Sequence, residues 1–230
     1  MRSAVRNALM HCAFVVAAMT LTGCASLPPA HADDYLARVE LLALLQTLNA
    51  DLLSHDSATL TLERWCADHR LAEPPRIVAR RLRDAVKPIP EDLRALLKVD
   101  AGEPIGYRHV QLVCGTHVLS EADNWYVPRR LTAEMNQRLD TTDEPFGKVV
   151  QPLHFRRSTL SAELLWSPLP PGWEMSAALP TPAGDRSALR VPDAVLRHRA
   201  ILLDAEQVPF STVVETYTNK IVNFGRWQVC

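Results

Sequence analysis

The period of the apolar residues changes near residue 105, and this change constrains the fold more than any other feature of the sequence. Before it, Leu42, Leu45 and Leu48 belong to a series with helical spacing, which predicts an amphipathic helix over residues 35–53. After it, four segments that alternate with a period of two are predicted strands: 105–114, 118–127, 195–203 and 208–218. Helices followed by strands, one helix and more strands favour an α+β fold with a single antiparallel sheet and helices packed on it.

The segments between these elements carry weaker patterns. Ser57 can cap a second helix that ends near His69. The further predicted elements are a strand at 76–86, helices at 90–98 and 128–139, one or two strands within 149–166, and an irregular Pro-rich insertion at 167–192. We expect one domain over residues 34–220, followed by a tail at 221–230 that packs on it through Phe224 and Trp227.

The first 23 residues have the parts of a bacterial export signal. Arg2 and Arg6 supply a positive start, and residues 8–19 are mostly apolar. The segment Leu21-Thr22-Gly23-Cys24 then resembles the lipobox of bacterial lipoproteins. We therefore expect a signal peptide over residues 1–23 that is cleaved before Cys24, acylation of the Cys24 thiol, and a tether over residues 25–33.

This reading places the protein in the cell envelope, anchored to a membrane through Cys24. The apolar stretch is shorter than the roughly 20 residues that a transmembrane helix needs, and no later segment is apolar enough to span a bilayer. The alternatives are an uncleaved amphipathic start, or translation from Met10 or Met19. A start at Met19 would remove the positive residues, leave the lipobox inert and give a cytoplasmic protein.

Charge and size narrow the function classes. The net charge is −1 for the whole chain, and it becomes −3 once Arg2 and Arg6 are removed with the signal. Such a balance argues against nucleic acid as a main partner. Residues 24–230 have the length of one larger domain or two small ones, which is ample for a hydrophobic core.

Three cysteines remain after processing, because Cys12 leaves with the signal and Cys24 is acylated. Of Cys66, Cys114 and Cys230, one pair can form, and the spacing does not indicate which. Two Cys-x-x-His pairs begin at Cys66 and Cys114, but no further Cys or His completes the ligand set that zinc needs. We therefore expect no metal site.

Two charged residues lie on strand faces that are otherwise apolar. Arg108 shares its face with Val110 and Leu112, and Glu215 shares its face with Val213 and Tyr217. A charge on a buried face is costly unless it is paired or meets a ligand. Arg108 and Glu215 are therefore either candidate ligand-binding residues, or partners in an internal Arg108–Glu215 ion pair, or solvated.

Six segments, in the same order, resemble the chorismate lyase family, and the likeness spans about residues 36–220. These segments are 52–59 (LLSHDSAT), Tyr107-Arg108, 125–128 (WYVP), 144–147 (EPFG), 158–160 (STL) and 214–217 (VETY). The resemblance implies that family's fold and its reaction, the conversion of chorismate to 4-hydroxybenzoate and pyruvate, which serves ubiquinone biosynthesis. It implies no cofactor and no metal.

The resemblance also assigns roles to residues. It implies that Arg108 grips a carboxylate, that Glu215 meets the ring hydroxyl and takes part in catalysis, and that Ala58 and Phe146 contact the ligand. Phe146 stands where the family has Leu, and Ala58 where it has Met, and both replacements alter the shape of the pocket more than its charge.

Three functions are consistent with these residues. The first is a lyase of the chorismate pyruvate-lyase type, with Glu215 and Arg108 as catalytic residues. The second is a non-catalytic lipoprotein that binds a small aromatic or cyclic carboxylic acid in the same pocket. The third is a structural envelope protein with an empty pocket. The export signal weighs against the enzyme, because chorismate is made in the cytoplasm.

Overall fold

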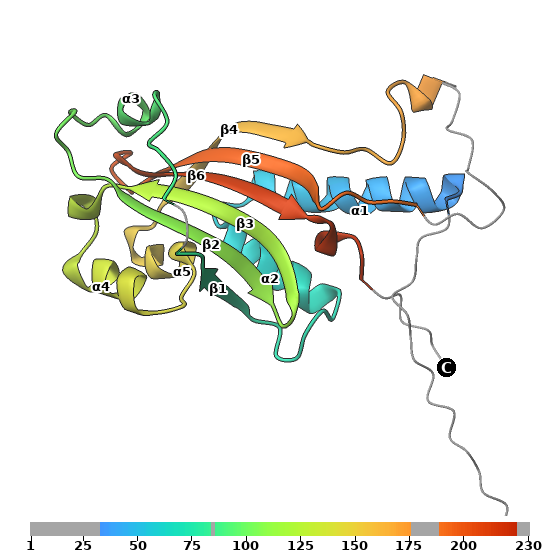
Figure 1. The fold of residues 1–230 in the computed structure, drawn as a ribbon, viewed down its shortest axis with the longest axis horizontal. Coiled ribbons are helices and arrows are strands. Elements are labelled where there is room, and N and C mark those ends of the chain that lie inside the picture. Colours follow the sequence, from blue (N-terminus) through green and yellow to red (C-terminus); the bar gives the residue numbers. More distant parts are fainter. Residues whose placement is uncertain (1–32, 84–85, 176–188, 225–230) are drawn as a thin grey trace, which may run out of the picture.

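A computed structural model describes residues 33–83, 86–175 and 189–224 of the chain. It has one six-stranded antiparallel sheet with helices packed on both faces (Figure 1). The strands are β1 (Ile77–Arg81), β2 (Gly106–Cys114), β3 (His117–Tyr126), β4 (Arg156–Leu164), β5 (Ala194–Leu203) and β6 (Pro209–Thr218). The α-helices are α1 (Tyr35–Ser54), α2 (Ala58–Asp68), α3 (Leu93–Leu97), α4 (Ala133–Thr141) and α5 (Phe146–Val149). The prediction of an α+β fold with a single antiparallel sheet is confirmed.

The two N-terminal helices begin at side-chain caps. The Asp34 carboxylate accepts a hydrogen bond from Ala37 N at 2.8 Å, and the Ser57 hydroxyl accepts one from Leu60 N at 3.3 Å. Along α1, one row of leucines is fully buried: Leu41, Leu45, Leu48 and Leu52. Their spacing of three or four residues brings them onto one face, which packs on the sheet.

The sheet has the strand order β1-β2-β3-β6-β5-β4. Its register pairs Arg108 with Asn124, Asn124 with Val213, and Ala122 with Glu215. Residues paired in this way point to the same face of an antiparallel sheet. Arg108, Asn124 and Glu215 therefore share one face, as the alternation of the sequence predicts.

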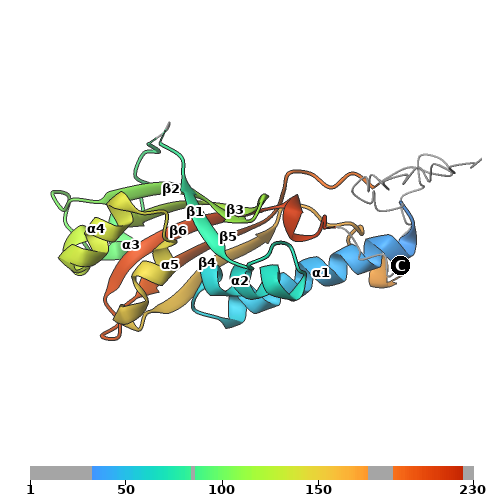
Figure 2. The same cartoon turned by 90° about the horizontal axis from the view of Figure 1, so that it is seen from below.

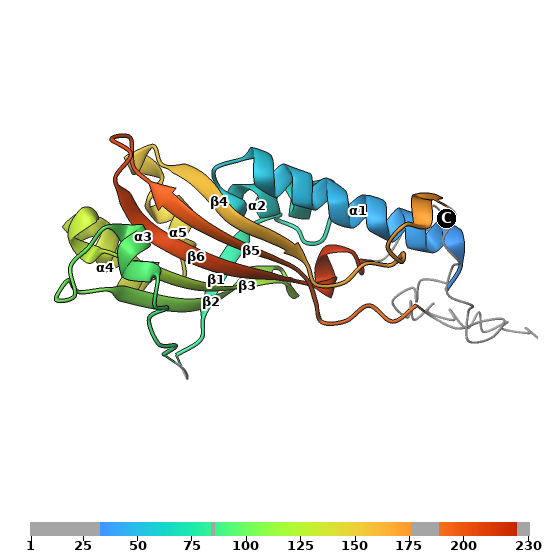
Figure 3. The same ribbon diagram turned by 90° about the horizontal axis from the view of Figure 1, so that it is seen from above.

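Helices α1, α2, α4 and α5 cover this face, which is called the inner face here (Figure 2). The short helix α3 packs on the outer face (Figure 3). Its Leu93 and Leu97 belong to one buried cluster with Trp125. The outer face is thus covered only in part. The side chains that could meet a ligand in a sheltered place belong to the inner face.

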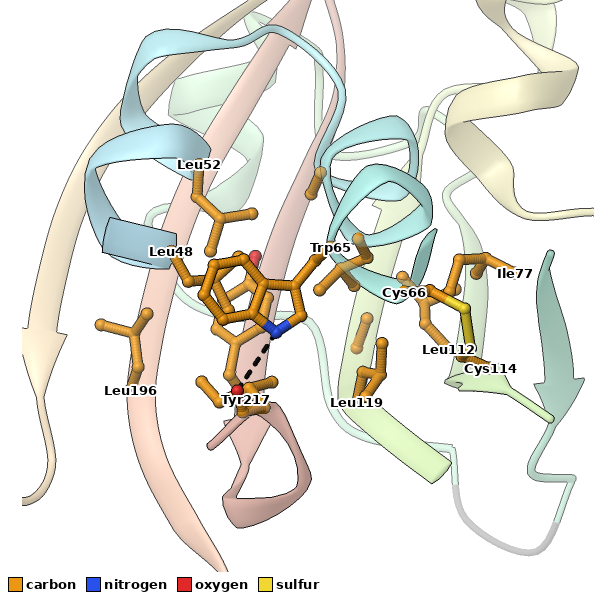
Figure 4. Packing of buried hydrophobic residues seen from close by; sticks show 14 of the residues in the cluster. Leu48, Leu52, Trp65, Cys66, Ile77, Leu112, Cys114, Leu119, Leu196 and Tyr217 are labelled. Atoms are coloured by element: carbon orange, nitrogen blue, oxygen red, sulfur yellow. Dashed lines mark hydrogen bonds between the residues drawn. A yellow bond between two sulfur atoms is a disulfide. The ribbon is translucent and has the colours of Figure 1, made fainter. Parts of the chain in front are cut away.

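The largest buried cluster lies between the inner face and helices α1 and α2 (Figure 4). Trp65 stands at its centre and donates a hydrogen bond from Nε1 to Ile221 O at 3.1 Å. A disulfide between Cys66 and Cys114 joins α2 to the end of β2 across 48 residues of sequence. It fixes the helix on the sheet.

Three predicted elements differ from the structure. The strand predicted at 76–86 ends at Arg81. The helix predicted at 128–139 is a 3-10 turn followed by α4, because Leu131 is extended and Thr132 caps a new helix by accepting from Met135 N at 3.1 Å. The strand predicted from residue 149 starts only at Arg156, since α5 and a second 3-10 turn precede it.

Several predictions fall largely on residues outside the described part. They are the signal peptide over 1–23, acylation of Cys24, nearly all of the tether, Trp227 in the tail, and residues 176–188 of the insertion predicted at 167–192. Phe224 lies within the described part, where its ring packs 4.6 Å from the ring of His69. Among the residues that the structure describes, no helix is both long and apolar enough to cross a membrane.

Candidate functional site

A cavity of about 50 Å³ opens between the inner face of the sheet and the starts of α2 and α5. Its sheet wall consists largely of Val110, Leu112, Ala122, Asn124, Val213 and Glu215. Phe146 and Phe155 close it from the side of α5, and Ala58 closes it from α2. The space holds a few water molecules, so a ring compound enters only if an aromatic side chain moves.

An ion pair forms the charged part of the wall. Arg157 Nη2 lies 2.5 Å from Glu215 Oε2, and the two side chains are only 3% and 7% exposed. Burial alone would lower the pKa of Arg157, but the attraction of Glu215 outweighs it and the pKa is raised. The same oxygen, Oε2, accepts a hydrogen bond from the Tyr217 hydroxyl at 3.0 Å.

Tyr217 and His198 complete the surroundings of Glu215. Burial raises the pKa of Tyr217 well above its usual range, and Glu215 adds to the effect, so the hydroxyl keeps its proton and donates. Burial lowers the pKa of His198 to about 4. Its Nε2 donates to Asn49 Oδ1 at 2.8 Å. At neutral pH both His198 and Tyr217 are therefore uncharged, and the charged group next to Glu215 is the guanidinium of Arg157.

Polar atoms without partners remain in the cavity wall. Among the described residues, Arg157 Nε and Asn124 Oδ1 are buried and have no hydrogen-bond partner. Glu215 Oε1 also accepts no hydrogen bond from the described residues, because the two side chains that donate to Glu215, Arg157 and Tyr217, both reach Oε2. Buried polar groups are normally paired, so the wall has unused capacity to donate and to accept hydrogen bonds.

Arg108 lies beside this cavity and does not line it. It is 2% exposed and donates one hydrogen bond, to Glu144 O at 3.3 Å, while its Nε and Nη1 have no partner among the described residues. Burial and the nearby charge of Arg81 lower the pKa of Arg108 to about 10, which leaves it charged at neutral pH. Asn124, opposite it in the sheet, is part of the cavity wall.

Three of the four residues to which the resemblance assigns ligand contacts line the cavity, and the fourth does not. Ala58, Phe146 and Glu215 line the cavity together, and Arg108 lies beside it on the same face of the sheet. The alternative of a direct Arg108–Glu215 ion pair is wrong, because Glu215 pairs with Arg157. The register explains this: Arg108 pairs with Asn124 and Glu215 with Ala122, so the two lie two strands and two residues apart.

The sequence analysis missed Arg157 and Asn124. Arg157 faces inward because it shares a face with Leu202, its partner on β5. The double arginine Arg156-Arg157 is a signal, but only the observed register tells which of the two points inward. Asn124 could have been found as the polar residue opposite Arg108 once the hairpin of β2 and β3 was aligned.

The other candidates of the sequence do not form sites. Cys66 and Cys114 are joined in the disulfide, so neither offers a thiolate to a metal. The described residues contain no group of three or more His, Cys, Asp or Glu that could hold a metal ion.

No protein-family model matches the chain. Solved structures resemble it at a distance. The effector domain of PhnF from Mycobacterium smegmatis is 13% identical, with a TM-score of 0.44, over 71% of this chain and 88% of that one. A GntR-family transcriptional regulator from Enterococcus faecalis is 13% identical, with a TM-score of 0.40, over 65% and 99%. Likenesses at this level assign neither a ligand nor a reaction to this chain, and neither protein is described as a chorismate lyase.

A much nearer relative occurs in Sinorhizobium fredii. It is described as uncharacterized protein y4mC and is 56% identical over 190 residues, which are 82% of this chain and 79% of that protein. Identity of this extent covers the domain and not a single motif. The chain therefore belongs to the same protein family as y4mC of Sinorhizobium fredii.

Proposed function

We propose that the protein binds a small carboxylated ring compound in the cavity on the inner face and does not transform it. The observation that carries this proposal is a sheltered space with apolar and aromatic walls, in which Arg157 Nε and Asn124 Oδ1 are buried without a partner among the described residues and Glu215 Oε1 accepts no hydrogen bond from them. Small-molecule sites combine such apolar walls with a few polar groups that fix orientation.

Arg108 is the proposed anchor of the ligand's carboxylate. A fully buried guanidinium with two unpaired nitrogens is costly unless an anion meets it. A carboxylate can accept two hydrogen bonds from one guanidinium. The ring of Phe146, which lines the cavity, lies 5.5 Å from the ring of Tyr126, and Tyr126 is close enough to Arg108 to affect its pKa. In this proposal Phe146 moves on binding and extends the cavity to Arg108.

The second candidate function is the lyase reaction, and the free oxygen of Glu215 favours it. In that reaction the bond between the ring and the enolpyruvyl oxygen breaks, and the ring carbon that bears the hydroxyl loses its proton. The ring becomes aromatic 4-hydroxybenzoate, and the released enolpyruvate takes up a proton to give pyruvate. Glu215 Oε1 is the base in this scheme, since it has no other partner among the described residues. Against it, Oε2 of the same carboxylate is held by Arg157.

The envelope location belongs to the same proposal. We propose that residues 1–23 direct export and that Cys24 carries the lipid. The disulfide between Cys66 and Cys114 supports this location, since disulfides persist in oxidising compartments and are rare in the cytosol. Cell fractionation tests it: the wild type is expected with the membranes, and Cys24→Ser is expected to leave them. Wild-type protein in the cytosolic fraction would overturn the location and leave the ligand proposal standing.

One experiment separates the two functions. The purified protein is mixed with chorismate while 4-hydroxybenzoate and pyruvate are followed, and its melting temperature is measured with and without 4-hydroxybenzoate. A raised melting temperature without turnover is the expected result. Release of both products in equal amounts, lost in Glu215→Gln, would make the protein a lyase. If 4-hydroxybenzoate neither binds nor forms, the proposed ligand class is wrong.

A further inference from the structure

We infer that the Arg157–Glu215 pair restricts the cavity to ring compounds with one carboxylate and excludes those with a second carboxylate at the far end. The inference rests on the proposed function and names the ligand class of the same site. Two observations support it: the net charge of the buried side chains around the cavity, and the hydrogen-bonding atoms that the Arg157–Glu215 pair leaves without partners.

The buried charges around the cavity sum to one positive charge. Arg108 and Arg157 contribute two positive charges, and Glu215 contributes one negative charge. His198 is uncharged at neutral pH, because burial lowers its pKa to about 4. Asp56 stands at the mouth and is exposed, so water screens it. One ligand carboxylate therefore balances the site.

Charges near Arg108 do not change this count. Arg81, Asp140 and Asp143 all act on it, and each of their side chains reaches solvent at least in part. Arg81 donates to the carbonyl oxygens of Leu139 and Asp140, at the end of α4. The unpaired atoms are those of Arg108 itself, Nε and Nη1.

A second carboxylate meets a repulsive neighbour at the other end. Arg157 already has its counter-ion, at 2.5 Å, so it has no charge left to balance. A ligand carboxylate placed there would face Glu215 Oε1, which is itself an acceptor without a donor. Two like charges in a poorly hydrated site repel each other strongly.

A hydroxyl or a carboxamide fits the same place. Either group can donate a hydrogen bond to Asn124 Oδ1 and accept one from Arg157 Nε, which are buried and have no partner among the described residues. It can also donate to Glu215 Oε1, since both side-chain donors to this carboxylate reach Oε2. The favoured ligand is thus a ring monocarboxylate with a neutral group of this kind at its opposite end. Chorismate carries its second carboxylate on the enolpyruvyl group, and the single net positive charge of the site leaves that carboxylate without a counter-ion, so the charge count also weighs against the lyase reaction.

Titration calorimetry on the full chain with 4-hydroxybenzoate and terephthalate tests this inference. These two acids have a carboxylate in common and differ in the group opposite to it. The wild type is expected to bind 4-hydroxybenzoate about tenfold or more tightly than terephthalate. In Glu215→Gln, which frees Arg157, the ratio is expected to fall or reverse in favour of the dicarboxylate. The control Glu121→Gln removes a carboxylate from the outer face of the same sheet and should leave the ratio unchanged.

Equal or tighter binding of terephthalate by the wild type would overturn the inference and leave the proposed function in place. This result needs no variant, so it holds even if Glu215→Gln does not fold. An unchanged ratio in a folded Glu215→Gln would also overturn it. If neither acid binds to the wild type, the proposed ligand class fails, and the inference fails with it.

Discussion

Arg157 on the edge strand β4 reaches across β5 to Glu215 on β6, and their charged atoms lie 2.5 Å apart with almost no exposure to solvent. The two side chains belong to the strands that flank β5, and Leu202 of β5 also lines the cavity. A pair of this kind is stable only as long as both members are present, because either charge alone would be buried without a counter-ion.

Arg157→Met is expected to lower the free energy of unfolding by about 3–5 kcal/mol, because it leaves the carboxylate of Glu215 buried and unpaired. Combining it with Glu215→Gln should recover part of the loss, since neither charge then remains. Urea denaturation of the wild type, both single variants and the double variant measures this coupling.

The matched control for this cycle is an exposed ion pair in the same sheet. Arg197 and Glu163 pair at 3.8 Å between β5 and β4, but their side chains are 48% and 61% exposed. Arg197→Met should therefore cost less than about 1 kcal/mol. Equal losses in Arg157→Met and Arg197→Met would mean that burial does not decide the strength of the inner pair.

Ala58→Leu is expected to abolish ligand binding with little change in stability. Ala58 lines the cavity, and three added carbon atoms occupy most of its volume of about 50 Å³. Calorimetry with 4-hydroxybenzoate measures the loss of binding, and thermal melting measures the change in stability. Ala67→Leu, on the exposed side of the same helix, is the control and should bind as the wild type does. Tight binding by Ala58→Leu would mean that the ligand lies elsewhere.

Removing the disulfide with Cys66→Ser and Cys114→Ser is expected to cost about 4 kcal/mol, from the chain entropy of a loop of 48 residues. Reduction of the wild type should give the same melting temperature as the double variant. A thiol assay on the unfolded, unreduced wild type checks the pairing. Two reactive thiols traced to Cys66 and Cys114 by peptide mapping would contradict it.

The stability of the protein should depend on His198 between pH 6.5 and 4. Burial lowers its pKa from 6.5 to about 4, so the unfolded chain binds the proton first as the pH falls. His198 therefore costs stability progressively below about pH 6.5, and the loss reaches about 3 kcal/mol near pH 4. Unfolding of the wild type and of His198→Met across this range should give profiles that converge toward low pH or cross.

The exposed residue His154 provides the control for this pH dependence. It has a positive φ of 46°, a conformation that asparagine also tolerates, so His154→Asn preserves the backbone. Its profile measures the effect of removing an exposed histidine, and the profile of His198→Met is compared with it. If the two profiles run parallel, His198 titrates in the folded protein as an exposed histidine does.

Local rules predict the regular part of the fold. The spacing of Leu42, Leu45 and Leu48 predicts a helix over 35–53, and the observed helix is Tyr35–Ser54. Alternation predicts β2, β3, β5 and β6 to within one or two residues. The segment at 128–155 is predicted poorly, because two successive caps and prolines there divide it into short helices whose lengths depend on tertiary contacts.

Part of the site is predictable for a similar reason. Glu215 stands out because it interrupts a run of β-branched residues, and alternation alone assigns it to the buried face. The double arginine Arg156-Arg157 is visible in the sequence, but alternation does not tell which of the two points inward, since β4 is an edge strand with few apolar residues to mark its inner face. The pairing of Arg157 with Glu215, like that of Cys66 with Cys114, depends on strand order, which alternation does not reveal.

The strand register has a consequence for how the members of this family can differ from one another. Five neighbouring strands each contribute to the cavity wall, for example through Val110, Asn124, Glu215, Leu202 and Arg157. The backbone hydrogen bonds that join these strands do not depend on which side chains stand there. A single substitution at one of these positions can therefore change the compound that is recognised while the sheet stays intact, so ligand preference can diverge faster than the fold.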